Sequence, residues 1–322
     1  MLSKDQEQLI NFLRNTGAGN TVSEELMNMY HVRKTENIMI PTRDGETHVY
    51  IHYPDSNQFP LPLFINIHGG GFIKGHREQD IVFSKNICSR ANCVVIDIDY
   101  TPAPEQKYPY ALHQCYDVVK WASKNSDLLQ IDPTKIALCG HSAGGNLAAA
   151  ITLLNNVRND FNIALQILDY PVLDLYTPPQ FKRNAYKNPQ KIPLHIAGLY
   201  NSAYVDEECR LDPTVSSRVA QLDTSTYVDE DSRLDPTVSP IFAPDEMLTG
   251  LPEAIIITCG DDYLGEEAEK YAYRLLEAGV AVTARRMLNS SHAFVVRRED
   301  QFEEAEKMIL CALSRVFTNN CF

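Results

Sequence analysis

Five short, uninterrupted runs of apolar residues constrain the fold of this chain more than any other feature. Each run has the length of a strand and carries apolar side chains at both odd and even positions, so both faces of the strand must be buried. Strands buried on both faces are typical of a parallel sheet covered by helices on its two sides. The runs are LFINI (63–67), CVVIDI (93–98), KIALCG (135–140), IALQIL (163–168) and AIIITCG (254–260).

Helical patterns between several of these runs favour the same fold class. Strand–helix alternation predicts an α/β protein with a mostly parallel central sheet and helices on both faces. A chain of 322 residues with 44% hydrophobic content supplies the core that such a fold needs, which excludes disorder as the dominant state. The predicted helices span 77–90, 109–125, 144–156, 266–278 and 300–317, and further strands are predicted at 47–53 and 280–287.

The N-terminal segment lies outside this alternation. Ser3 with Gln6, and Thr21 with Glu24, are capping-box patterns that each predict the start of a short helix. We expect these helices to pack against the rest of the protein, because neither presents the cationic face that membrane binding requires.

A second segment, residues 176–245, also breaks the rhythm. It holds many prolines and charges and no buried-strand run, so it is predicted to be an insertion over the sheet. Within it, YVDEECRLDPTVS (204–216) returns as YVDEDSRLDPTVS (227–239), with a period of 23 residues. One extra copy is too few for a repeat architecture and indicates a local tandem duplication.

Charge and cysteine usage limit the partners and the compartment. The chain has 29 Lys+Arg and 42 Asp+Glu, a net charge of −13, and no basic cluster, so we expect no nucleic-acid or anionic-membrane partner. No apolar run approaches the ~18 residues of a membrane span, and the N-terminus is too polar for a signal peptide. The eight cysteines form no C-x-x-C pair, which indicates free thiols in the cytoplasm.

Glycine is scarce, and seven of the 15 glycines fall in two windows, 69–75 and 140–145. The second window, GHSAGG, follows a predicted strand and precedes a predicted helix. A G-x-S-x-G sequence in that place is a nucleophile elbow, a tight turn that lifts the Ser142 hydroxyl above the sheet.

The first window, HGGGF at 68–72, directly follows the strand 63–67. Three successive glycines leave backbone amides that can donate to an oxyanion at the carboxyl end of the sheet. A phosphate loop is the competing use of such glycines, but neither of its sequence patterns is present. No H-E-x-x-H or Cys/His ligand spacing occurs either, so no metal and no cofactor are predicted.

A serine nucleophile needs a base and an acid, which follow it in the order acid, then histidine. Only His195 and His292 lie after Ser142. His292 comes just past the last strand and is the predicted base, whereas His195 lies in the insertion and is expected to be structural or substrate-facing. The acid should follow the strand 254–260, where Asp261 and Asp262 are both candidates.

Two other histidines lie near the serine in sequence. The side chain of His141 is not expected to reach the hydroxyl of its neighbour Ser142 in so tight a turn. His68 belongs to the glycine loop and is expected to brace it.

These blocks together make the chain resemble the hormone-sensitive-lipase-like branch of the α/β-hydrolase superfamily, in particular its bacterial acetyl-esterase-type carboxylesterases. The matching blocks, in order, are HGGGF (68–72), YTPAPE (100–105), GHSAGG (140–145) and DDYL…SSHAF (261–294), within a resemblance that covers roughly 45–317. The resemblance implies an α/β-hydrolase fold with a cap over the active site.

The resemblance also assigns residues. It selects Asp262 over Asp261 and implies oxyanion donors at Gly70, Gly71 and Ala143. It implies that residues 1–35 and 176–245 form the cap, and that 36–175 and 246–322 form the catalytic domain. The sequence departs from the family pattern at His141, where an acidic residue is common, and in YTPAPE, which replaces Y-R-L-A-P-E. Glu105 in the YTPAPE block is expected to be a structural hydrogen-bond partner.

The predicted function is that of a serine carboxylesterase in which Ser142, Asp262 and His292 form the catalytic triad. Its expected partner is a small-molecule ester. The predicted cap segment is polar and has no long apolar lid helix, so we expect esters of short acids to be preferred. An amidase or peptidase could use the same triad, and a non-catalytic ligand-binding protein of this fold is the alternative outside enzymes. Neither the substrate-binding residues nor an oligomeric state can be predicted from the sequence.

Overall fold

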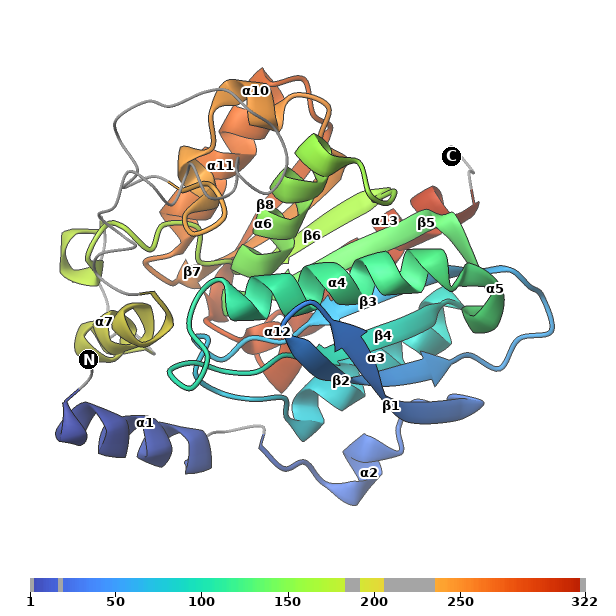
Figure 1. The fold of residues 1–322 in the computed structure, drawn as a ribbon, viewed down its shortest axis with the longest axis horizontal. Coiled ribbons are helices and arrows are strands. Elements are labelled where there is room, and N and C mark those ends of the chain that lie inside the picture. The colour runs from blue at the N-terminus through green and yellow to red at the C-terminus, as the bar shows by residue number, and fades with distance from the viewer. Residues whose placement is uncertain (1–2, 17–19, 183–191, 206–234, 319–322) are drawn as a thin grey trace.

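The computed structural model describes residues 3–16, 20–182, 192–205 and 235–318, and eight strands among them form one sheet (Figure 1). The strand order is β1-β2-β4-β3-β5-β6-β7-β8. Strand β2 pairs antiparallel with β1 and β4, and the other neighbouring strands are parallel. This confirms the predicted mostly parallel α/β sheet. The strands are β1 (Lys34–Thr42), β2 (Gly45–Tyr53), β3 (Leu61–Ile67), β4 (Val94–Asp99), β5 (Ile131–His141), β6 (Leu165–Asp169), β7 (Glu253–Asp261) and β8 (Val282–Ser291).

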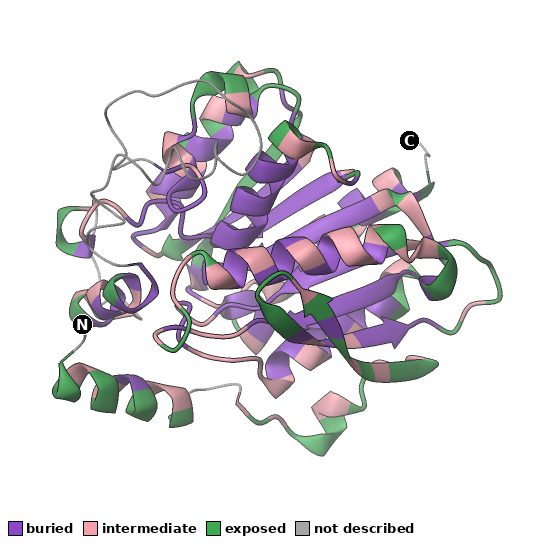
Figure 2. Cartoon of the chain, viewed as in Figure 1, coloured by how far each residue is buried: buried purple, intermediate pink, exposed green. Residues whose placement is uncertain are grey.

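Helices cover both faces of the sheet, so the strands are buried on both sides (Figure 2). Along β3, Leu63, Ile65 and Ile67 belong to one hydrophobic cluster, and Phe64 between them belongs to the other. This alternation explains why the apolar runs are uninterrupted, because successive side chains enter opposite layers. One layer contains α4 (Tyr110–Lys124), α6 (Ala143–Arg158) and α11 (Gly265–Glu277); the other contains α3 (Glu78–Ala91) and α13 (Phe302–Thr318).

Strand β1 was not among the predicted strands. It lies at the edge of the sheet, pairs only with β2 among the described strands, and buries a single residue, Ile40. With so little burial, it lacks the apolar run that identifies the central strands. It begins at Lys34, two residues before the predicted start of the catalytic domain.

Two helices from distant parts of the sequence pack together beside the carboxyl edge of the sheet (Figure 1). Helix α1 (Lys4–Asn15) begins with the expected capping box, and α7 (Leu194–Tyr204) lies within the predicted insertion. Ile10 of α1 and Leu199 of α7 share a small hydrophobic cluster with Ile73, which follows the glycine loop. The α1–α7 pair therefore rests on the loop that carries the glycines.

Helix α7 is an exception to the polar character predicted for the cap segment. It is short, but six of its 11 residues are buried. No polar capping side chain precedes it, since Pro193 is the residue before its first turn, so the sequence lacks the usual start signal.

The chain returns from the insertion in the second copy of the duplicated segment, which packs against the core. The side-chain amide of the buried Asn146 donates to the carbonyl oxygens of Val172 and Val238, each at 2.9 Å. The Ser239 hydroxyl accepts from the Leu175 amide at 3.0 Å. The end of the second copy is therefore part of the packed structure.

The start of the first copy is packed as well. The Tyr204 ring stacks on Phe72 with centroids 3.8 Å apart, and both Tyr204 and Val205 are buried. The start of the first copy and the end of the second are therefore packed, and residues 206–234 between them lie outside the described part of the chain.

The remaining elements are short. None of the helices in the described ranges is long and apolar enough to cross a membrane. The remaining short elements are α2 (Glu24–Met27), α5 (Ser126–Leu129), α10 (Asp245–Leu248), α12 (Phe294–Arg297), η1 (Pro179–Phe181) and η3 (Pro240–Phe242).

Candidate active site

Ser142 lies in a tight turn between the end of β5 and the start of α6. Its backbone has φ 54° and ψ −110°, a strained conformation that the surroundings must hold. The Ser142 amide donates to the Asp169 carbonyl at 2.9 Å, and its own carbonyl accepts from the amides of Asn146 and Val172. A side chain at Gly144 would lie 2.1 Å from the Ile67 carbonyl oxygen, which explains the need for glycine there. The turn therefore has the geometry of the predicted elbow.

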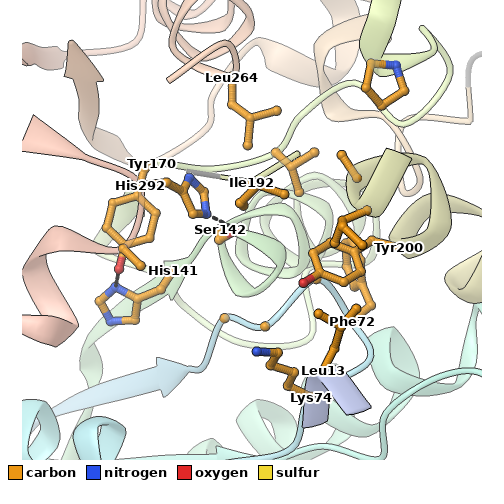
Figure 3. Close-up of a pocket in the computed structure, with 18 of the residues that line it drawn as sticks. Leu13, Phe72, Lys74, His141, Ser142, Tyr170, Ile192, Tyr200, Leu264 and His292 are labelled. Atoms are coloured by element: carbon orange, nitrogen blue, oxygen red, sulfur yellow. Dashed lines mark hydrogen bonds between the residues drawn. The ribbon is translucent and has the colours of Figure 1, made fainter. Parts of the chain in front are cut away.

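Three predicted side chains meet at this turn. The Nε2 atom of His292 lies 2.8 Å from the Ser142 hydroxyl oxygen, and its Nδ1 atom lies 2.6 Å from Oδ2 of Asp262 (Figure 3 shows the serine and histidine). The other Asp262 oxygen accepts from the Leu264 amide at 3.0 Å. The His292 and Asp262 side chains are 8% and 4% exposed, so water competes little for these hydrogen bonds.

The structure also separates the two adjacent acids. Asp261 is the last residue of β7, pairs with Ser291 of β8 and is exposed. Asp262 is the next residue along the chain, and its side chain turns inward to His292. The strand register therefore places only Asp262 beside the histidine.

The glycine loop forms one wall of the cavity in front of Ser142. Gly70 and Gly71 line this cavity, and the Gly70 carbonyl accepts from the amides of Ile73 and Lys74, which closes a turn. Gly71 has φ +62°, and a side chain there would lie 2.4 Å from the ring of Tyr200 on α7. Ala143 is the first residue of α6, so its amide has no acceptor within the helix.

The other histidines have structural contacts. His68 stacks on Tyr100 with centroids 4.1 Å apart and donates from Nδ1 to the Gly69 carbonyl, so it braces the loop as expected. His141 points away from the serine hydroxyl, and its Nδ1 lies 2.7 Å from Asp169. His195 is exposed on α7 and is absent from the cavity wall, so it does not face a substrate there.

Glu105 connects the N-terminal helix to the rest of the chain. The Arg14 guanidinium of α1 donates to both Glu105 carboxylate oxygens, at 2.7 and 2.6 Å, and lowers the pKa of that carboxyl group. Arg14 also donates to the carbonyls of Ile73 and Ala103. The expected structural role of Glu105 therefore includes holding α1 beside the glycine loop.

The cavity has a volume of about 310 Å³ and opens onto Ser142 and His292 (Figure 3). Side chains from α1 and α7 complete its wall, among them Leu13 and Tyr200. Its apolar lining residues also include Phe72, Val172, Ile192, Ile196, Ala197, Leu264 and Val296.

Tyr170 is a site residue that sequence reasoning missed. Its ring packs edge-on against His292 with centroids 5.0 Å apart, and its hydroxyl lies 3.3 Å from Nδ1 of His141. The signal was available, because Tyr170 directly follows a buried strand at the edge where the carboxyl ends of the parallel strands meet.

No group of three or more His, Cys, Asp or Glu side chains in the described ranges is placed to hold a metal ion.

Comparison with known proteins identifies the family. Residues 64–226 and 212–296 match a family model described as the alpha/beta hydrolase fold. An arylesterase of Saccharolobus solfataricus is 32% identical over 82% of this chain and 78% of its own length. An esterase of Pyrobaculum calidifontis is similar in structure, with a TM-score of 0.76 and 28% identity over 97% of this chain and 93% of that one.

A thermostable carboxylesterase from a metagenomic library has a TM-score of 0.77 and 25% identity, and the match covers 98% of this chain and 100% of that one. These proteins do not single out the bacterial acetyl-esterase type, which stays a prediction. The family match, the related sequences and the strand order agree, and the chain belongs to the α/β-hydrolase family.

Proposed function

We propose that the protein is a serine carboxylesterase that hydrolyses esters of short carboxylic acids through an acyl-enzyme intermediate. The observation that carries this proposal is the hydrogen-bonded series from Asp262 through His292 to Ser142, which ends at the wall of a cavity. The relatives support the ester bond as the target, since those named above are an arylesterase, an esterase and a carboxylesterase.

The reaction begins with the Ser142 hydroxyl. Its proton passes to Nε2 of His292 as the oxygen attacks the ester carbonyl, and the 2.8 Å separation suits direct transfer. Asp262 accepts a hydrogen bond from the Nδ1–H group of His292, which fixes the tautomer that leaves Nε2 free and stabilises the imidazolium that forms.

The tetrahedral oxyanion then accepts hydrogen bonds from the amides of Gly70, Gly71 and Ala143. His292 returns its proton to the departing alcohol oxygen, and the acyl group stays on Ser142. Water repeats the sequence on the acyl-enzyme: His292 takes a proton from it, the acid leaves, and Ser142 regains its hydrogen.

Short acyl groups are the expected substrates, from acetyl to about hexanoyl. The cavity of about 310 Å³ lies at the lower end of the roughly 300–1,000 Å³ range of ligand pockets. The side chains of Leu13 of α1 and Tyr200 of α7 line it, which limits the room for a long acyl tail. Faster hydrolysis of emulsified long-chain triglyceride than of a soluble butyrate ester would contradict this part of the proposal.

A cytoplasmic location is also part of the proposal. Cys88, Cys93, Cys115 and Cys139 are buried free thiols, which suit a reducing compartment.

Replacing the nucleophile tests the proposal. Ser142→Ala is expected to lower kcat on 4-nitrophenyl butyrate by roughly 10⁴–10⁶, because it removes the hydroxyl that is hydrogen-bonded to His292. Ser202→Ala, which changes an exposed serine on α7, is the matched control and is expected to keep wild-type activity. A folded Ser142→Ala protein that keeps a tenth of the activity would contradict the assignment.

A further inference from the structure

The cavity at Ser142 is lined by basic side chains and by no acidic ones among the described residues. Lys74, Arg77, Lys182 and Arg297 all belong to its wall. The whole chain carries a net charge of −13, so this positive lining is opposite in sign to the rest of the protein. Basic groups are concentrated where the substrate must bind.

Two of these four side chains are already neutralised by the protein. The Lys182 ammonium lies 2.6 Å from Oε2 of the buried Glu267. The Arg77 guanidinium lies 3.4 Å from the buried Asp80. Neither Lys182 nor Arg77 therefore needs an anionic ligand to balance its charge.

Lys74 and Arg297 differ, because no described residue gives either side chain a hydrogen bond or an ion pair. The Nε atom of Arg297 is buried without any hydrogen-bond partner. Burial and the neighbouring cations Arg77 and Arg297 lower the pKa of Lys74 to about 8. Such partly desolvated, unpaired charges are costly, and an anion in the cavity would relieve that cost.

Both side chains line the same cavity as Ser142 and His292. Lys74 follows the glycine loop, and its amide donates to the Gly70 carbonyl. Arg297 ends the short helix α12, whose first residue is two positions beyond His292. Figure 3 shows Lys74 at the cavity wall on the side of the glycine loop, with Ser142 and His292 across the cavity.

We propose that the preferred substrates are esters that carry a carboxylate group, and that Lys74 and Arg297 bind this group. The inference rests on the proposed esterase function and names its substrate class. A guanidinium matches the two oxygens of a carboxylate, and an ammonium adds a second charge-assisted hydrogen bond. The carboxylate can belong to the acyl part, as in a half-ester of a dicarboxylic acid, or to the alcohol part, as in an ester of a hydroxy acid.

Matched pairs of esters test the preference and distinguish the two sources of the carboxylate. Monoethyl adipate against diethyl adipate places the charge on the acyl part, and 3-acetoxybenzoate against its methyl ester places it on the alcohol part. In at least one pair, kcat/KM at pH 7 is expected to be about tenfold higher for the anion, the gain typical of one charged hydrogen bond.

Two variants test the residues. Lys74→Met and Arg297→Met are each expected to lower the anion-to-neutral ratio of kcat/KM by about tenfold, chiefly by raising KM for the anion. Lys124→Met is the matched control, since Lys124 is an exposed lysine at the end of α4 and does not line the cavity. An unchanged ratio in both cavity variants would overturn the assignment of these residues.

The pH dependence of the wild-type enzyme supplies a test that does not depend on folding of the variants. Because Lys74 loses its charge near pH 8, the anion-to-neutral ratio is expected to fall as pH rises from 7 to 9. A wild-type enzyme that hydrolyses the neutral esters but shows no preference for the anion overturns this inference alone, whereas failure to hydrolyse any ester overturns the proposed function.

Discussion

A methyl group at Gly71 is expected to damage both stability and catalysis, because it would disturb the contact between the glycine loop and α7. In Gly71→Ala the new carbon lies 2.4, 2.6 and 2.7 Å from three ring atoms of Tyr200, where ordinary carbon contacts are roughly 3.5–4.0 Å. The ring must therefore retreat by about 1 Å or the loop must move. Overpacking of this kind costs about 1–3 kcal/mol, and a left-handed alanine adds about 1–2 kcal/mol.

The same displacement bears on catalysis. If the loop moves, the Gly71 amide is misplaced, and loss of one oxyanion donor lowers kcat by roughly 10²–10³. The assay is a double-mutant cycle of Gly71→Ala and Tyr200→Ala, with urea unfolding and kcat on a short neutral ester. Removing the ring relieves the overlap, so the double variant is expected to be more stable and more active than the sum of the single effects predicts.

Gly198→Ala is the control for this cycle, because Gly198 lies on α7 and a side chain there meets nothing within 4 Å. This control should be neutral or slightly stabilising, as alanine favours a helix. A Gly71→Ala enzyme with kcat within twofold of wild type, or a cycle with strictly additive effects, would refute the reasoning.

Three further predictions concern the acids, the duplication and pH. Asp262→Asn should lower kcat by up to roughly 10⁴, because it favours the wrong histidine tautomer, and Asp261→Asn should lower it far less. Steady-state kinetics that give the reverse ranking would contradict the assignment of Asp262 as the acid. Deleting Tyr204–Thr226 removes one repeat period and joins Ala203 to Tyr227, so Tyr227 and Val228 should take the packed places of Tyr204 and Val205. The variant should stay folded and active, as thermal unfolding and an ester assay would check, since loop length changes stability by only about 0.6 kcal/mol per doubling. Burial lowers the pKa of His76, but Asp97 at 2.7 Å outweighs it and raises that pKa to about 9. The protonated His76 therefore contributes about 3 kcal/mol to the free energy of unfolding, fully present below pH 6.5 and lost as pH rises to 9. The free energy of unfolding should fall over this pH range, and the fall should be smaller in His76→Gln.

The central sheet and the meeting of the triad were predictable because both depend on local patterns. A strand buried on both faces leaves a continuous apolar run, and parallel strands bring the residues after their carboxyl ends to one edge. That is why Ser142 and His292 could be paired from sequence. The choice of Asp262 over Asp261 needed the family resemblance, since one residue of register at the end of β7 decides which carboxylate turns inward.

The cavity wall was not predictable in the same way. Leu13 comes from a helix before the catalytic core in sequence and Tyr200 from the insertion between its two halves, and only tertiary packing brings them to one cavity. Lys74 likewise lies just after the glycine loop and Arg297 at the end of α12, and neither residue belongs to a motif. The edge strand β1 escaped prediction because it buries too little to require an apolar run.

Covalent labelling of the nucleophile tests the central claim most directly. After reaction of the wild-type protein with an aryl phosphonate ester, tandem mass spectrometry should locate one phosphonyl adduct per chain on the peptide that contains Ser142. The adduct should be absent from Ser142→Ala, and its formation should parallel the loss of ester hydrolysis. An adduct on another residue, or full loss of activity with Ser142 unmodified, would contradict the account.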